Sequence, residues 1–266
     1  MINFYINSSV YVQVVIAALI TWGITALGAS IVFFFKKVNG NILDAMLGLS
    51  AGVMISASFF SLLNPAINQA DNLGMTSWVI VSLGFACGGI FLILGDLIFN
   101  YFLERRNTNN IKSIKRSIML IFSITLHNIP EGLAIGVAFG SIAMGVEGAT
   151  LIAAVMLAVG VAIQNFPEGT AVSLPLRREN FSRFKSFIYG SLSGIVEPIS
   201  ALIGCLLVMY VRNILPFLLA FAAGAMIYVA ISELIPESQK NKHKNLMSLF
   251  TIVGFVIMMI LDISLG

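Results

Sequence analysis

The chain is dominated by apolar runs that are long enough to cross a lipid bilayer. Hydrophobic residues make up 58% of its 266 positions and charged residues 10%, whereas soluble domains carry roughly 25% charged residues. Crossing a hydrocarbon core of about 30 Å takes about 20 helical residues. The stretches that meet this length are eight: 10–35, 42–63, 77–101, 117–142, 149–175, 185–211, 215–235 and 246–265. The sequence therefore predicts an all-α integral membrane protein with one polytopic domain, residues 1–266.

The basic residues predict how this domain is oriented. Of the 15 Lys and Arg residues, 14 fall in the loops after the first, third, fifth and seventh stretches, and Arg212 alone falls on the other side. Cytoplasmic loops carry the excess of Lys and Arg. We therefore expect those four loops, including the basic loop 102–117, to be cytoplasmic, and both termini to lie outside. The net charge of +3 then reflects topology and not nucleic-acid binding. Because no basic residue precedes the first stretch, we expect it to be retained and not cleaved as a signal peptide.

Two of the predicted spans carry nearly the same polar motif, His-Asn-Ile-Pro-Glu-Gly at 127–132 and Gln-Asn-Phe-Pro-Glu-Gly at 164–169. Residues three or four apart share a helix face, so the first, second and fifth residues of each motif point toward one region. A carboxylate at the bilayer centre costs about 2.5–3.5 kcal/mol, and the spans offer no Lys or Arg as a partner. A bound cation fits, with these candidate ligands: His127, Asn128, Glu131, Gln164, Asn165 and Glu168.

The chemistry of these ligands is mixed, and two questions each have an alternative answer: what the polar residues do, and what the two prolines do. Imidazole suits zinc, copper, iron or nickel, whereas carboxylate and amide oxygens also admit manganese. One alternative is a hydrogen-bonded network that only holds helices together. The other concerns Pro130 and Pro167, which remove the N–H groups that would bond to the carbonyls of Leu126 and Ile163. The freed carbonyls would open the site to water, or the prolines would merely bend the helices.

On these motifs, the eight stretches and the Val196-Glu197-Pro198 element, the chain resembles the ZIP family of divalent metal transporters in its short prokaryotic form. The resemblance implies a two-metal centre in helices four and five, bridged by Glu131 and Glu168. One position would also use His127 and Gln164, with Met54 as a thioether neighbour. The other would add Asn128, Asn165 and Glu197. Asn165 replaces an aspartate of some relatives, which would weaken the second position.

Residues outside the paired motifs are less clearly assigned. Met54 is also explained as packing filler. Glu197 is an acid without a basic partner, and we expect Pro198 to lie in the middle of a span and to free a further carbonyl. Asp96, Glu233 and Asp262 are candidates for lining the ion pathway. Asp262 would alternatively lie at the outer interface, and the histidine that often precedes the acid at Glu233 in relatives is missing here.

Weak internal similarity predicts an inverted repeat of helices 1–3 and 6–8 around a central pair, helices four and five. Residues 51–55 resemble residues 223–227, and Gly84-Phe85 resembles Gly254-Phe255. In the predicted topology the matching segments run in opposite directions, as in many transporters, although chance similarity between apolar segments is an alternative. Glycines spaced four apart, as at Gly84 and Gly88, favour packing within the chain over a homodimer interface.

These features predict a transporter and not an enzyme. The substrate would be zinc, or else iron, manganese or cadmium, moved into the cytoplasm by an elevator-like cycle that the resemblance implies, with no prosthetic group. We expect a multi-pass protein of the cell membrane, the bacterial inner membrane by resemblance. An intramembrane metalloenzyme is disfavoured, because no His-Glu-x-x-His motif occurs. A proton-coupled carrier of a non-metal substrate would leave His127 unexplained.

Overall fold

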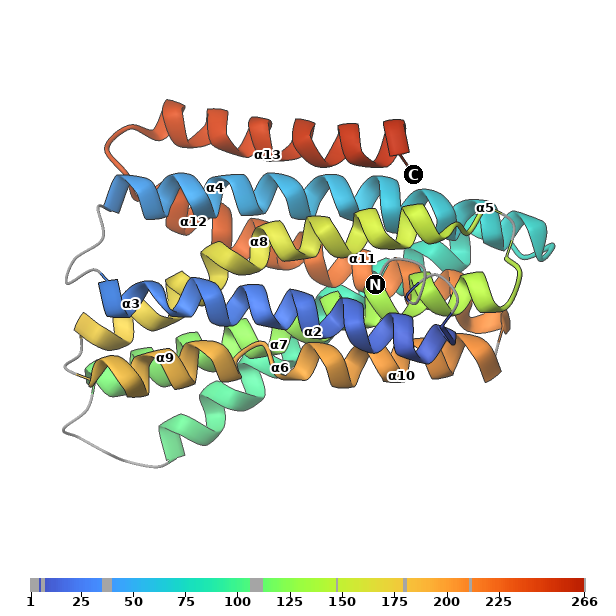
Figure 1. Ribbon diagram of the computed structural model, residues 1–266. Helices are drawn as coiled ribbons and strands as arrows, with labels where there is room; N and C mark the ends of the chain where they lie inside the picture. The colour runs from blue at the N-terminus through green and yellow to red at the C-terminus, as the bar shows by residue number, and fades with distance from the viewer. Residues whose placement is uncertain are drawn as a thin grey trace.

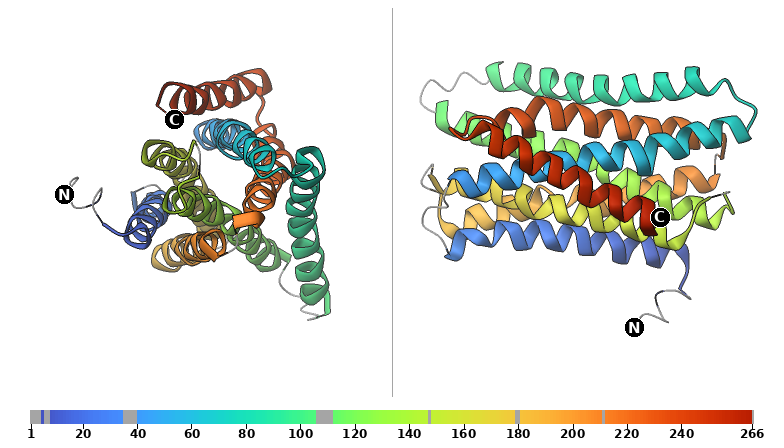
Figure 2. Two further views of the ribbon diagram at one scale, coloured as in Figure 1. Left: turned by 90° about the vertical axis from the view of Figure 1, so that its right-hand side faces the viewer. Right: turned by 90° about the horizontal axis from the view of Figure 1, so that it is seen from above.

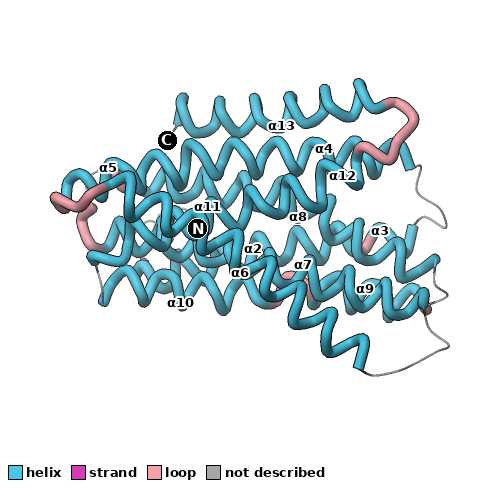
Figure 3. The backbone as a smooth tube through the Cα atoms, turned by 180° about the vertical axis from the view of Figure 1, so that it is seen from behind, coloured by secondary structure: helices cyan, strands magenta, loops and turns pink. Residues whose placement is uncertain are grey.

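The computed structural model describes residues 5, 8–34, 40–105, 112–146, 148–178, 181–210 and 212–265. The side chains of some helical residues, His127 among them, are outside this description. All regular secondary structure in the described ranges is helical, and the helices are joined by short connections (Figure 3). The prediction of an all-α protein is confirmed for this part of the chain.

The helices follow the predicted apolar stretches and lie roughly along one common direction (Figure 1). Helical runs continue past several predicted ends, most clearly at α5, which extends the second stretch. The elements are α2 (Val10–Ala29), α3 (Ile31–Phe34), α4 (Gly40–Ala57), η1 (Ser58–Leu63), α5 (Asn64–Asn72), α6 (Ser77–Arg105), α7 (Lys112–Ala143), α8 (Leu151–Arg178), α9 (Arg183–Leu192), α10 (Val196–Tyr210), η2 (Arg212–Ile214), α11 (Leu215–Val229), η3 (Ala230–Leu234), α12 (Ile235–Ser238) and α13 (Lys244–Leu265).

Seven helical runs among the described residues are long and apolar enough to cross a bilayer. The predicted stretch 117–142 is helical throughout, within α7, but it is not one of the seven. Most side chains in its first half lie outside the described residues. The structure therefore supports a multi-pass membrane protein, and the count of eight spans stays a prediction.

The predicted basic loop 102–117 is partly helical. Helix α6 runs on to Arg105 and α7 begins at Lys112, so helix extends into the loop from both sides. Residues 106–111 lie outside the described residues. Helix can continue where the sequence has turned polar, because Lys, Arg and Glu are good helix formers.

The predicted sixth span, 185–211, consists of two helices. α9 ends at Leu192, and a turn over residues 193–195 precedes α10, which begins at Val196. Pro198 therefore lies in the first turn of α10, where a missing N–H costs no helical bond. The carbonyl of Gly194 accepts instead from the Glu197 backbone N–H at 3.0 Å. Pro198 lies near the middle of the candidate span 183–209, as expected. The expectation that it frees a carbonyl was wrong, because the helix is interrupted before it.

Glycines mark where helices touch backbone to backbone, and one set joins α4 to α13 and α6 to α11. A Cβ added to Gly52 would lie 1.9 Å from the Thr251 carbonyl oxygen, and one added to Gly224 would lie 1.9 Å from that of Phe85. Gly88 meets the Phe221 carbonyl oxygen at 2.0 Å in the same way. These four helices form what we call the first bundle.

A second set of glycines joins α7 to α10 and α2 to α8, and the helices α2, α7, α8, α9 and α10 are called the second bundle. A Cβ on Gly136 would lie 1.9 Å from the Ala201 carbonyl oxygen, and one on Gly28 would lie 2.0 Å from that of Phe166. In the left view of Figure 2, which looks along the helices, α2 and α10 lie on one side of the molecule. Helix α6 lies on the opposite side and α13 at the top. The spaced glycines thus pack within the chain, as predicted, and give no support to a dimer interface.

Two helices of the first bundle widen into π-helix, a feature that the sequence analysis missed. The segment η1 continues α4 from Ser58, and η3 continues α11 from Ala230. Each is followed by a proline in the first turn of the next helix, Pro65 in α5 and Pro236 in α12. π-helical turns are rare and occur frequently at functional sites.

Candidate metal site

The two motifs lie in the middle of α7 and α8, and their polar side chains are buried. Asn128, Glu131, Gln164 and Asn165 are each 0% exposed and Glu168 is 1% exposed. The Gln164 amide nitrogen of α8 donates to the Glu131 carboxylate of α7, so the two motifs contact each other directly. The side chain of His127 lies outside the described residues.

All three motif amides are held through their nitrogen atoms. Asn128 Nδ2 donates to the Ser193 carbonyl oxygen at 2.9 Å. Asn165 Nδ2 lies 3.2 Å from the Thr21 carbonyl oxygen and donates to the Glu197 carboxylate, and Gln164 donates to Glu131 as above. Because an amide is planar, fixing its nitrogen also fixes the direction of its oxygen.

Most side-chain oxygens of the two motifs, in contrast, lack hydrogen-bond donors among the described residues; the exception is Glu131 Oε1, which accepts from Gln164. The atoms concerned, called here the unpaired oxygens, are six: Asn128 Oδ1, Glu131 Oε2, Gln164 Oε1, Asn165 Oδ1, Glu168 Oε1 and Glu168 Oε2. Buried acceptors without a partner cost about 1–3 kcal/mol each, and native structures contain few of them. A bound cation would supply the missing partner, because one cation can coordinate several oxygens and oxygen ligands suit divalent metals.

The site is not a compact cluster of the usual metal-binding side chains. Within the described part of the chain, no three His, Cys, Asp or Glu residues form a group that could hold a metal ion. The acids of the motifs are instead interleaved with amides, and the charges of Glu131, Glu168 and Glu197 act on one another. A cation there would be held by amide oxygens as well as by carboxylates.

Met54 and Glu197 were the other predicted ligands, and both are 0% exposed. Glu197, in the first turn of α10, is joined to Asn165 by hydrogen bonds of 3.0 and 2.9 Å. Met54 lies in α4, where the neighbouring Ser50 hydroxyl is 3.4 Å from the Gln164 carbonyl oxygen. The structure therefore brings Glu197 to the second motif and α4 to the same stretch of α8.

The final glycine of each motif has a packing role that the sequence analysis did not assign. A Cβ on Gly132 would lie 2.0 Å from Ser200 Oγ and 2.4 Å from the Glu197 carbonyl oxygen. A Cβ on Gly169 would lie 2.0 Å from the Thr25 carbonyl oxygen. These glycines let α10 and α2 approach the motif helices closely, which brings Glu197 and Thr21 to the site. Their spacing after each motif glutamate was the available sequence signal.

The three predicted pathway acids separate toward opposite ends of the bundle. Asp262 lines a cavity of about 390 Å³ beside α5 and the end of α13, together with Ser61, Asn64 and Asn68. The Ser61 hydroxyl donates to Asp262. Glu233 lies in η3, and its charge acts on both Asp96 and Glu168. Asp262 thus lies at the end with the termini, whereas Glu233 lies near both Asp96 and Glu168.

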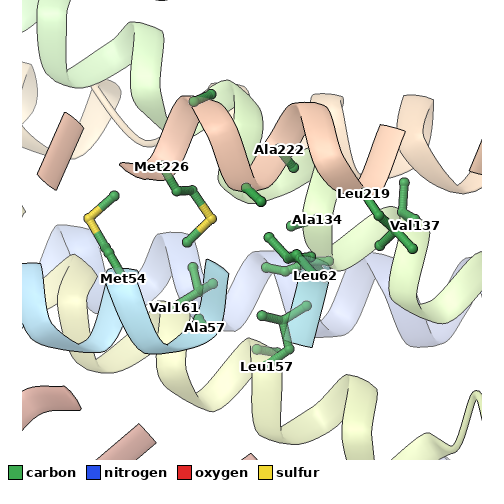
Figure 4. Close-up of a cluster of buried hydrophobic side chains, with 14 of the residues drawn as sticks. Met54, Ala57, Leu62, Ala134, Val137, Leu157, Val161, Leu219, Ala222 and Met226 are labelled. Atoms are coloured by element: carbon green, nitrogen blue, oxygen red, sulfur yellow. The ribbon is translucent and has the colours of Figure 1, made fainter. Parts of the chain in front are cut away.

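An apolar layer separates this cavity from the motifs. Figure 4 shows Leu62, Leu157, Val161, Met54 and Met226 gathered between α4, α8 and α11, and each of these side chains is at most 1% exposed. Leu157 also lines the cavity. Along α8 it is followed on the same face by Val161, Gln164 and Glu168, because residues three or four apart share a helix face.

Comparison with known proteins points to one family. A model of the ZIP zinc transporters matches residues 107–262. The human zinc transporter ZIP11 is 36% identical, with 98% of this chain and 99% of ZIP11 aligned. The zinc transporter ZIPB of Bordetella bronchiseptica is 33% identical over 91% of this chain and 78% of its own length, and the zinc transporter ZupT of Streptococcus mutans is 35% identical over 88% and 90%. The chain, with its paired motifs in the middle of α7 and α8, belongs to the ZIP family of zinc transporters.

Proposed function

We propose that this protein carries zinc across a membrane into the cytoplasm, with the two motifs as its binding site. The observation that carries the proposal is the set of six unpaired oxygens, buried between α7 and α8. A substrate that brings positive charge and no hydrogen-bond acceptors of its own matches this set. The relatives ZIP11, ZIPB and ZupT bear the name of zinc transporters, which favours zinc among the divalent ions.

The ligand set that we propose joins oxygen donors to softer atoms. The oxygens come from Glu131, Glu168 and the motif amides, the imidazole from His127, and the thioether from Met54. Because imidazole suits zinc and iron while the oxygens also suit manganese, we expect a broad range that includes iron, manganese and cadmium. The two-metal arrangement implied by the family resemblance stays a prediction.

We propose that alternating access comes from movement of the second bundle against the first, as in an elevator. The close glycine contacts support this division, since α4 packs on α13 and α7 on α10 by backbone contact within each bundle. Gly160 of α8 faces the other bundle, and there a Cβ would meet the flexible end of Met258, with Sδ at 2.4 Å. Side-chain contacts can slide and re-form more easily than backbone contacts, which interlock.

The pathway that we propose begins at the cavity beside Asp262 and ends near Glu233 and Asp96. Zinc would gather among Asn64, Asn68 and Asp262, pass the apolar layer when the bundles move, and reach the motifs. Glu233 would then draw the ion onward by its charge. The buried side chains of the apolar layer close this conformation toward the cavity.

The inverted repeat is also part of the proposal, with new support from the backbone. Met54 and Met226 are 172 positions apart, and so are the starts of the π-helical segments at Ser58 and Ala230. A repeated departure from α-helix at matching positions is harder to obtain by chance than a repeated apolar sequence, because π-helix is rare. The repeat would relate helices 1–3 to helices 6–8.

Zinc entry into liposomes tests the proposed function. Purified protein is reconstituted, zinc is added outside, and a trapped fluorescent dye reports its arrival. We expect entry for the native chain and none above the protein-free rate for Glu131→Ala with Glu168→Ala, because both motif carboxylates are lost. Equal entry with the double variant would remove the motifs from the transport path. Zinc binding without entry in the native protein would instead indicate a sensor.

Labelling of single cysteines tests the orientation and the membrane location that we propose, the bacterial cell membrane. With Cys87 and Cys205 replaced by alanine, Asn72→Cys is expected to react with a membrane-impermeant maleimide on intact cells. Lys242→Cys is expected to react only after the cells are opened, because the basic loops lie in the cytoplasm. The reverse pattern would contradict the topology derived from the Lys and Arg distribution.

A further inference from the structure

Glu197 differs from the other acids of the site in that both of its carboxylate oxygens accept a hydrogen bond. Its Oε1 accepts from Asn165 Nδ2 at 3.0 Å, with Thr25 Oγ1 at 3.5 Å, and its Oε2 accepts from the same Asn165 nitrogen at 2.9 Å. Both oxygens of Glu168, by contrast, are among the unpaired oxygens. The Glu197 carboxylate is therefore already hydrogen-bonded, whereas the Glu168 carboxylate lacks donors.

The surroundings of Glu197 provide further compensation and leave little room. The residue lies in the first turn of α10, where the positive end of the helix dipole stabilises a negative charge. The place where Gly194 would carry a Cβ is 3.1 Å from Glu197 Oε1, 3.1 Å from the Trp22 ring and 3.2 Å from the Thr25 methyl group. The carboxylate is thus enclosed by α2 and by the turn before α10.

The Asn165 amide occupies the position from which a cation would bind both oxygens of Glu197. One N–H group of Nδ2 serves the Thr21 carbonyl and the other is shared by the two carboxylate oxygens. A metal ion at Glu197 would have to displace these donors, and it would meet the positive end of the amide dipole. The hydrogen bonds turn the amide so that its Oδ1, an unpaired oxygen, faces away from Glu197.

We propose that the site takes one divalent cation, in place of the two that the family resemblance implies, and that Glu197 is a positioning residue that holds the Asn165 amide with its oxygen directed at that cation. This inference rests on the proposed function and sharpens it. The cation is bound by the unpaired oxygens of the two motifs, while Glu197 acts through Asn165. Groups that orient a metal ligand in this way typically change the affinity about 10–100-fold when altered.

The number of zinc ions bound per chain tests the inference directly. Detergent-purified protein is dialysed to equilibrium against buffered zinc, and metal is counted by mass spectrometry, with Glu131→Gln plus Glu168→Gln as the background. We expect one zinc per native chain. Glu197→Gln, which keeps the shape and one acceptor, is expected to bind one zinc with about 10–100-fold lower affinity. Asn165→Asp removes the N–H donors and adds a second acid beside Glu197, so we expect it to bind two.

Each outcome of this experiment bears on a different part of the reasoning. Two zinc ions per native chain, with one lost in Glu197→Gln, would overturn the inference and leave the proposed function standing. No zinc above background in the native protein would overturn the proposed function itself. A single zinc in correctly folded Asn165→Asp would overturn the role given to the amide. If Asn165 only stabilised the fold, Asn165→Asp would not bind a second zinc ion.

Discussion

Replacing Glu168 with glutamine is expected to abolish stabilisation of the protein by zinc and, at the same time, to raise its melting temperature in the presence of a chelator. Neither oxygen of Glu168 accepts a hydrogen bond, although the side chain is 1% exposed. Glutamine removes the buried acid and brings an N–H₂ group to a site whose unpaired atoms are all acceptors. Relief of an unsatisfied buried acceptor is worth about 1–3 kcal/mol.

The loss of zinc stabilisation has a separate cause and size. A ligand that binds the folded state alone stabilises it by about 2.7 kcal/mol when present at 100 times its dissociation constant. The native protein should therefore melt at a higher temperature with zinc than with a chelator, whereas Glu168→Gln should melt at the same temperature in both. Differential scanning fluorimetry in detergent measures both values.

A matched control is available at the turn before α13. Glu237 is an exposed acid paired with Lys240, so Glu237→Gln makes the same chemical change far from the motifs. Exposed ion pairs contribute about 0–1 kcal/mol, and we expect this variant to keep the full zinc response. A zinc response retained by Glu168→Gln, or a fall in its melting temperature with chelator, would contradict the part assigned to Glu168.

The two motifs could be recognised as a candidate site from the sequence alone, although that site stays a prediction. Polar residues in a membrane span are costly, so a repeated pair of motifs in apolar surroundings could be identified without any coordinates. Their partners were harder to predict. The bonds from Asn128 to Ser193 and from Asn165 to Thr21 join residues 65 and 144 positions apart. Such contacts depend on which helices pack together, which composition and hydropathy do not specify.

The fold could be predicted to the level of helices but not to the level of their irregularities. Apolar length indicated the spans, because a helix satisfies its own backbone hydrogen bonds inside a membrane. The turn before α10 and the π-helical segments η1 and η3 carry no such signal. Pro198 illustrates the difficulty, since the same residue can kink a helix or begin one, and its place depends on where the preceding α9 ends.

At the glycine of the second motif we expect a large loss of stability from a single small change. Gly169→Ala would place a methyl group 2.0 Å from the Thr25 carbonyl oxygen and 2.9 Å from the Ala29 nitrogen. Because both obstacles are backbone atoms, α2 and α8 must move apart. Overpacking costs about 1–3 kcal/mol and occasionally more. The hydrogen bond of 3.0 Å from Thr170 Oγ1 to the Gly28 carbonyl would be strained as well. We expect a sharply lower yield of monodisperse protein.

Gly23→Ala makes the same substitution in α2 at a place where a Cβ meets nothing within 4 Å. Alanine favours helix over glycine by about 1 kcal/mol, so this variant should fold as well as the native chain or better. Size-exclusion chromatography in detergent gives the monodisperse yield, and thermal denaturation ranks whatever protein is recovered. Equal yields and melting temperatures for the two variants would mean that α2 and α8 can separate freely. That result would contradict the close packing of the second bundle, and with it the reason for a glycine directly after each motif glutamate.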